Sequence, residues 1–138
     1  MNRDFMRGLI VEESFAYGFT IAFWGTGLLL INEFSLLHTV GILKYAVGTV
    51  TGFGLLAVTT FGGAVDTVEN QSTPQYHILA GIHYLAALVP IGAAHLIVAA
   101  PLGTGLTLFL TGSVVSVGYN ISAAVEELVS ELLWRIEQ

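Results

Sequence analysis

Long apolar stretches with very few charges between them constrain this chain more than any other feature. Between positions 15 and 125 only four side chains are charged, and they are Glu33, Lys44, Asp66 and Glu69. The charged fraction of the whole chain is 10%, and its mean hydropathy is +0.78. Soluble domains carry about 25% charged residues. The sequence therefore predicts a protein whose surroundings are the lipid bilayer.

The apolar residues fall into four continuous stretches, each about as long as a membrane-spanning helix. A helix needs roughly 20 apolar residues to cross a hydrocarbon core of about 30 Å. Strands of a membrane barrel would alternate apolar and polar residues over about ten positions. The predicted spans are residues 15–32, 39–64, 78–100 and 104–125. This pattern predicts an all-α integral membrane protein, a four-transmembrane-helix bundle.

The two ends of the chain differ from the spans between them. Residues 1–14 include Arg3 and Arg7 and are expected to form an N-terminal interfacial segment. Residues 126–138 predict an amphipathic C-terminal helix with an acidic polar face. Membrane-surface helices favour Lys and Arg on that face, so we expect contact with another subunit or protein, and the membrane surface is the alternative. The apolar contact face would comprise Val125, Leu128, Val129, Leu132, Leu133 and Ile136.

The few basic residues indicate the orientation in the membrane. Arg3 and Arg7 precede the first span and Arg135 follows the fourth, whereas Lys44 alone argues for the opposite side. Cytoplasmic segments collect Lys and Arg, and four spans place both termini on one side. We therefore expect a multi-pass protein of the cell membrane with both termini in the cytoplasm.

The charge balance is acidic, with ten Asp and Glu against four Lys and Arg and a net charge of −6. This balance argues against nucleic acid and anionic lipid headgroups as partners. It suits a cytoplasm of high salt, so a haloarchaeal source is our hypothesis. The alternative is a small chain whose few charges happen to be acidic. The chain has no cysteine, which excludes disulfides, iron–sulfur clusters and thiolate metal sites within it.

Small and hydroxylated residues mark the second span. Gly48 and Gly52 form a Gly-xxx-Gly pair, which lets two helix backbones approach closely in lipid. Thr49, Thr51 and Thr60 are candidates for a hydroxyl-lined path, because Thr49 and Thr60 fall about 20° apart around the helix. The alternative is that each hydroxyl bonds the carbonyl three or four residues earlier and needs no other partner.

The third span contains Pro90 and two histidines. Pro90 cannot donate a backbone hydrogen bond and is expected to kink the helix. His83 and His95 are ionisable groups at membrane depth, and such groups are candidates for a proton or ion pathway. His38, at the start of the second span, lies at a depth similar to that of His95, and this pair is the candidate for two axial haem ligands. A structural or interfacial role is the alternative, and a metal site is not expected because three ligands do not fall together.

Three functional hypotheses follow from these patterns. No nucleophile–base pair, phosphate-binding loop or carboxylate cluster occurs, so we expect no catalytic activity. The leading hypothesis is a homo-oligomeric channel or passive transporter for a small ion or solute, which needs no cofactor. A non-catalytic accessory subunit of a larger membrane complex is the first alternative. A haem-binding electron-transfer subunit is the second.

Overall fold

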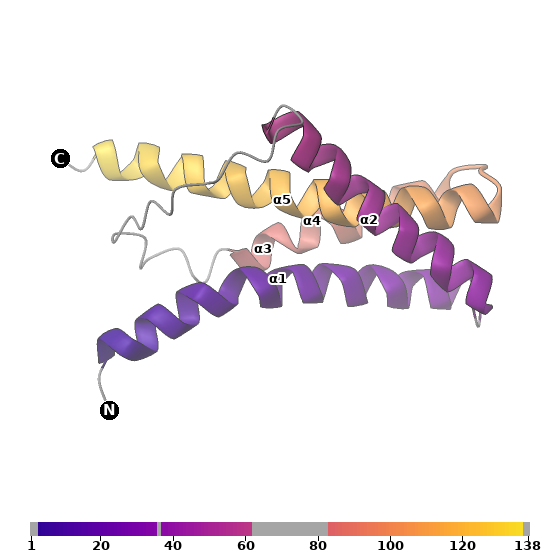
Figure 1. The fold of residues 1–138 in the computed structure, drawn as a ribbon, viewed down its shortest axis with the longest axis horizontal. Coiled ribbons are helices and arrows are strands. Elements are labelled where there is room, and N and C mark those ends of the chain that lie inside the picture. The colour runs from indigo at the N-terminus through magenta and orange to yellow at the C-terminus, as the bar shows by residue number, and fades with distance from the viewer. Residues whose placement is uncertain (1–2, 36, 62–82, 137–138) are drawn as a thin grey trace.

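The computed structural model describes residues 3–35, 37–61 and 83–136, and every regular element in this part of the chain is an α-helix. The helices are α1 (Arg3–Phe34), α2 (Thr39–Phe61), α3 (His83–Ala86), α4 (Leu88–Ala99) and α5 (Thr104–Ile136) (Figure 1). The predicted all-α class is therefore confirmed for the described residues.

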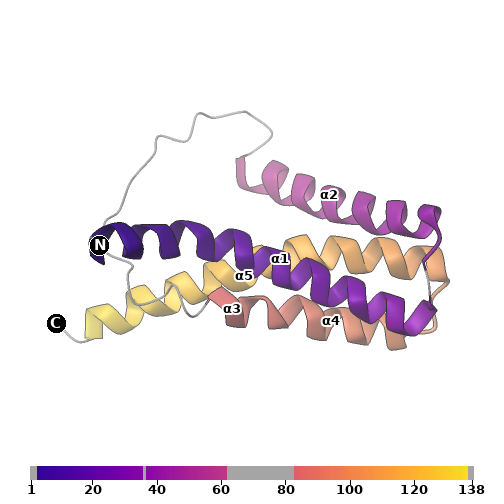
Figure 2. The same cartoon turned by 90° about the horizontal axis from the view of Figure 1, so that it is seen from below.

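The helices are arranged around α5, which contacts each of the others. α2 packs along one side of α5 and α4 along the other, while α1 lies against α4 and α5 (Figure 2). The α1–α2 turn and the α4–α5 hairpin lie at one end of the bundle, and the two chain termini lie at the other (Figure 1). A chain that crosses a membrane back and forth an even number of times would have its connections and termini arranged in this way.

Local sequence explains both connections at the shared end. The chain leaves α1 through Ser35, whose φ of 60° is left-handed and ends the helix. Ala100 is extended, with φ −76° and ψ 148°, because the ring of Pro101 disfavours helical backbone in the residue before it. The carbonyl oxygen of Gly103 then accepts a hydrogen bond from the Leu106 N–H at the start of α5.

A break separates α3 from α4 at Ala87, three residues before Pro90. Pro90 has no N–H to donate to the carbonyl of Ala86, four residues earlier, and this loss accounts for the break. Ala87 keeps helical dihedral angles, with φ −68° and ψ −25°, so α4 continues nearly in the direction of α3 (Figure 2). Residues 78–82 of the predicted third span lie outside the described residues.

Within the described residues, two helical stretches are long and apolar enough to cross a membrane, Thr39–Thr60 and Thr104–Val129. α4 is apolar but has only 12 residues, about 18 Å of helix. The predicted span 15–32 lies within α1, which begins earlier, at Arg3. Residues 62–64 of the second predicted span lie outside the described residues. A membrane location is thus supported by two helices, and the number of four spans stays a prediction.

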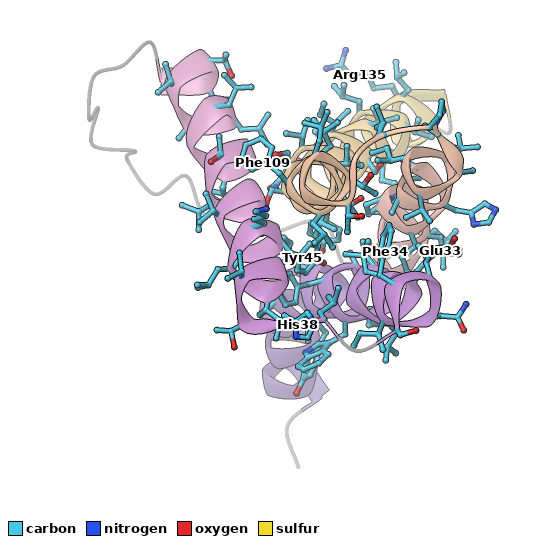
Figure 3. All side chains as sticks on the ribbon, turned by 90° about the vertical axis from the view of Figure 1, so that its right-hand side faces the viewer. Glu33, Phe34, His38, Tyr45, Phe109 and Arg135 are labelled. Atoms are coloured by element: carbon cyan, nitrogen blue, oxygen red, sulfur yellow. The ribbon has the colours of Figure 1, made fainter. Side chains whose placement is uncertain are left out.

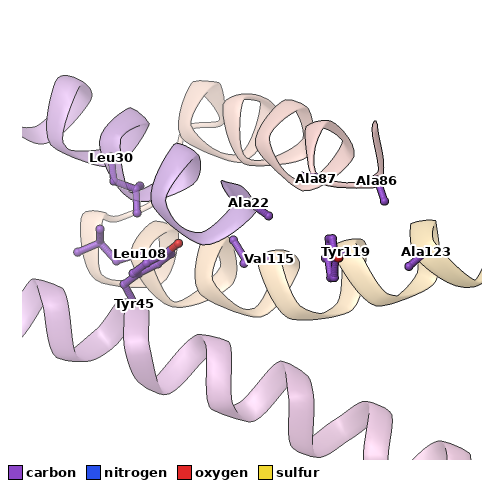
Figure 4. Close-up of a cluster of buried hydrophobic side chains, with 9 residues drawn as sticks. All are labelled: Ala22, Leu30, Tyr45, Ala86, Ala87, Leu108, Val115, Tyr119 and Ala123. Atoms are coloured by element: carbon purple, nitrogen blue, oxygen red, sulfur yellow. The ribbon is translucent and has the colours of Figure 1, made fainter. Parts of the chain in front are cut away.

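Many large apolar side chains face outward in this bundle, and its core includes several small ones. Val50 on α2 and Leu96 on α4 are each 72% exposed. The core contains four alanines and a few larger residues (Figure 4). Its members are Ala22, Leu30, Tyr45, Ala86, Ala87, Leu108, Val115, Tyr119 and Ala123. Because lipid removes the hydrophobic drive between helices, small residues at helix contacts are typical of membrane bundles.

Candidate functional site

The backbones of α2 and α5 approach closely, and Gly48 and Gly52 lie at this contact, which we call the α2–α5 crossing. A Cβ atom added to Gly48 would overlap the carbonyl oxygen of Phe109, and one added to Gly52 would lie 2.6 Å from a backbone oxygen of α5. On the α5 side, a Cβ atom added to Gly112 would overlap the carbonyl oxygen of Tyr45. Any larger residue at these three positions would push the helices apart.

Two serines of α5 bond to the backbone of α2 at the crossing. The Ser113 hydroxyl donates to the carbonyl oxygen of Gly48 over 3.0 Å, and the Ser116 hydroxyl donates to that of Thr49 over 2.7 Å. Neither serine was predicted from the sequence. The available indication was the spacing of Gly112, Ser113 and Ser116, which places three small residues on one side of a helix.

Two of the predicted threonines of α2 bond to the backbone of their own helix. The Thr49 hydroxyl donates to the carbonyl oxygen of Tyr45 at 3.0 Å, and the Thr51 hydroxyl donates to that of Val47 at 2.8 Å. Thr51 and Thr60 are exposed, whereas Thr49 is half-buried. Thr49 and Thr51 therefore follow the alternative in which the hydroxyl bonds its own helix.

Tyr45 joins α2 to α1. Its side chain is buried, and its hydroxyl donates to the carbonyl oxygen of Phe23 over 2.8 Å. The ring centroids of Tyr45 and Phe23 are 5.0 Å apart, and Figure 3 shows Tyr45 on the side of α2 that faces the bundle. This contact links α2 to α1, in addition to the α2–α5 crossing described above.

The two histidines predicted as a haem pair are not brought together. His38 precedes α2, where its carbonyl oxygen accepts hydrogen bonds from the N–H groups of Gly41 and Ile42, and its side chain is exposed (Figure 3). His95 is exposed on α4, and α2 and α4 lie on opposite sides of α5 (Figure 2). His83 begins α3, but its side chain lies outside the described residues. Among the residues that are described, no group of three could hold a metal ion.

His95 lies well inside the length of the bundle. A Cβ atom added to Gly118 of α5 would be 3.4 Å from the Cβ of Pro90 on α4. Because these helices run antiparallel (Figure 2), His95, five residues after Pro90, is level with position 113 of α5. That position is about 14 Å along α5 from Thr104, the first residue of the membrane-length stretch Thr104–Val129.

A second group of polar side chains lies inside the bundle. Thr26, Thr107, Thr111 and Ser116 are each at most 1% exposed. Thr107 and Ser116 donate hydrogen bonds to backbone carbonyls. The hydroxyls of Thr26 and Thr111 have no hydrogen-bond partner in the described part of the chain. They were not predicted from the sequence, because a single threonine in an apolar helix forms no pattern.

The predicted contact face of the C-terminal helix is exposed where it is described. Four of its six side chains are 49–60% exposed, namely Val125, Leu128, Val129 and Leu132. The side chains of Leu133 and Ile136 lie outside the described residues. Glu126, beside this face, accepts a hydrogen bond from the Ala86 N–H of α3. The tail continues α5 without a break, so the face is an extension of the bundle surface.

Comparisons with known proteins assign no family to this chain. No protein-family model, no curated protein and no solved structure matches the chain. The polar side chains that stand out within the described bundle are the exposed His95 and the buried Thr26 and Thr111.

Proposed function

We propose that the chain is a four-pass protein of the cell membrane, with both termini in the cytoplasm, that assembles with copies of itself into a passive channel or transporter for a small ion or solute. The observation that supports this proposal is the exposed side chain of His95 on the apolar helix α4, level with position 113 inside the membrane-length stretch Thr104–Val129 of α5. Ionisable side chains are costly in lipid and generally face a bundle interior or an aqueous path. His95 faces outward from the single chain, so a neighbouring subunit has to supply its polar surroundings.

The face of α4 around His95 suits a helix of a second copy. Gly92, Leu96 and Ala99 are exposed at helical spacing on the same side, and a Cβ atom added to Gly92 would meet nothing within 4 Å. Bare backbone of this kind lets a partner helix approach closely. Neutral imidazole has one donor and one acceptor nitrogen, so two copies of His95 related by a two-fold axis can bond directly or through water.

A path at this contact would run between subunits rather than through one chain. His95 would supply a hydrogen-bonding group to a permeating solute away from bulk water. Thr49 and Thr51 would contribute less, because their hydroxyls already bond the backbone of α2. This arrangement favours a passive route, since the described part of α4 carries no carboxylate to couple flux to protons.

Native mass spectrometry of the protein, extracted gently from its own membranes, tests the assembly. A species at a multiple of 14.7 kDa is expected, and monomers alone would contradict the proposal. His95→Leu should shift the population toward monomers, whereas His95→Gln should retain most of the oligomer because its amide also donates and accepts. Val50→Ala is the control, since it removes apolar surface from α2, away from the proposed contact of α4, and leaves the imidazole.

Flux through liposomes tests the path. We expect the reconstituted protein to raise the permeation of at least one small ion or neutral solute well above that of empty liposomes. His95→Leu should abolish the increase and Val50→Ala should not. An assembled protein without flux for any solute of the panel would contradict the channel and leave only the assembly.

The exposed end of α5 favours the accessory-subunit function as a second candidate. Val125, Leu128, Val129 and Leu132 offer a continuous apolar face at 49–60% exposure. Such a face fits a groove of a larger membrane protein. Co-purification of one larger protein, lost in Leu128→Ser and Leu132→Ser but kept in His95→Leu, would favour this function over the channel.

A further inference from the structure

One face of α1 is fully buried and contains three residues spaced four apart. Ala22, Thr26 and Leu30 are each 0% exposed. The facing side of α5 is equally closed, with exposures of 3% or less, and comprises Leu108, Thr111 and Val115. Each of these two buried faces thus has a threonine between two apolar residues.

The register of α1 and α5 sets the two threonines level with each other. The helices run antiparallel (Figure 2), and Figure 4 places Ala22 beside Val115 and Leu30 beside Leu108. Each threonine lies about halfway between the two core residues of its own helix. The two hydroxyls therefore occupy the same level of the α1–α5 contact, away from both ends of the bundle.

Neither hydroxyl makes the hydrogen bond to its own helix that a helical threonine usually makes. Such a hydroxyl commonly bonds the carbonyl three or four residues earlier, as Thr49 and Thr51 do in this chain. The hydroxyls of Thr26 and Thr111 have no partner among the described residues, including each other. An unsatisfied buried hydroxyl is costly, and two of them at one level of one contact indicate a shared third group.

We propose that Thr26 and Thr111 bind one water molecule between α1 and α5. A buried water needs two to four polar partners, and each hydroxyl can both donate and accept. The buried polar residues of the described chain are threonines and a serine, without a charged side chain. An uncharged guest is therefore favoured over an ion. This site belongs to the single chain and does not depend on the assembly proposed above.

Replacement of the threonines by valine, singly and together, tests the shared guest. Valine keeps the branched shape and lacks the hydroxyl. If one water joins the two residues, Thr26→Val and Thr111→Val should each raise the unfolding equilibrium constant in detergent about fivefold, and the double variant should add little more. If each valine leaves the constant unchanged or lowers it, the proposal is overturned. Thr51→Val, at an exposed and self-bonded hydroxyl, is the matched control and should change the constant little.

Solid-state NMR of the protein in bilayers separates water from a direct bond between the hydroxyls. Transfer of magnetisation from water to the Thr26 and Thr111 signals is the expected result, although both residues are 0% exposed. The two valine replacements could have non-additive effects on the unfolding constant while no magnetisation passes from water to the threonines. That result would mean that the two hydroxyls bond each other, and it would overturn the proposal.

Discussion

The hydroxyl of Ser113 lies 3.0 Å from the carbonyl oxygen of Gly48, to which it donates a hydrogen bond from α5 to the backbone of α2. A serine side chain is short, so this bond requires the two backbones to lie very close together. Gly48 permits that approach because it has no Cβ atom. In lipid, packing and hydrogen bonds of this kind replace hydrophobic association as the cause of helix contact.

Gly48→Ala is expected to lower the free energy of unfolding by about 1–3 kcal/mol. The new Cβ would overlap the carbonyl oxygen of Phe109, and backbone cannot move aside as a flexible side chain can. Denaturant titration in detergent micelles measures the change. Gly54→Ala on the same helix is the matched control, because its added Cβ meets nothing within 4 Å. An equal loss in both variants would contradict the importance of the α2–α5 crossing.

Tyr45→Phe is expected to lower the free energy of unfolding by about 1 kcal/mol. The change removes the hydroxyl that donates to the carbonyl oxygen of Phe23 and keeps the ring that packs beside it. The same detergent titration measures the loss. Tyr17→Phe on α1 removes a hydroxyl from a side chain that is 54% exposed and should change stability little. If Tyr45→Phe also left stability unchanged, the link between α2 and α1 would have to come from other contacts.

Local patterns account for the parts of the fold that were predictable. Continuous apolar runs indicate helices because every backbone group in lipid needs an internal partner. The Gly-xxx-Gly spacing identified Gly48 and Gly52 because residues four apart fall on one helical face, and this face is the one that contacts α5. The helix ends were less predictable. α1 begins at Arg3 and α5 extends to Ile136, because a change from apolar to charged composition does not by itself stop a helix.

The polar residues were hard to predict because their meaning depends on which helices are neighbours. His38 and His95 were predicted at similar depth, but His95 is level with Ser113, whose hydroxyl bonds Gly48, ten residues after His38. In addition, α5 lies between their helices (Figure 2). The sequence gives the position of a residue along its own helix, and not the register or the side of the bundle at which that helix packs. Thr26 and Thr111 are the converse case, since only the register of α1 against α5 brings them level.

Ser35→Gly is expected to raise the free energy of unfolding by about 1 kcal/mol. Ser35 has a φ of 60° at the end of α1, and glycine adopts this left-handed backbone without the steric cost of a Cβ atom. The measurement is again denaturant titration of the purified protein. Ser35→Ala keeps a Cβ atom at the strained position and should give no gain. A gain of equal size for alanine would point to the serine hydroxyl rather than the backbone.

Cysteine labelling in sealed vesicles tests the crossing pattern. The chain has no cysteine of its own, so one introduced thiol reports its position without background. The α1–α2 turn and the α4–α5 hairpin lie at one end of the bundle (Figure 1). Ser35→Cys and Gly103→Cys should therefore react with a membrane-impermeant maleimide from the same side, the outside if both termini are cytoplasmic.

The lipid-facing control for this labelling is Val50→Cys. Val50 is 72% exposed in the middle of α2, so a thiol there is buried only if lipid covers it. We expect this thiol to resist the water-soluble maleimide until detergent dissolves the vesicle. Rapid reaction in intact vesicles would mean that water covers the apolar surface of α2, contrary to a membrane span. Labelling of Ser35→Cys and Gly103→Cys from opposite sides would instead mean an odd number of crossings between them, which four spans do not allow.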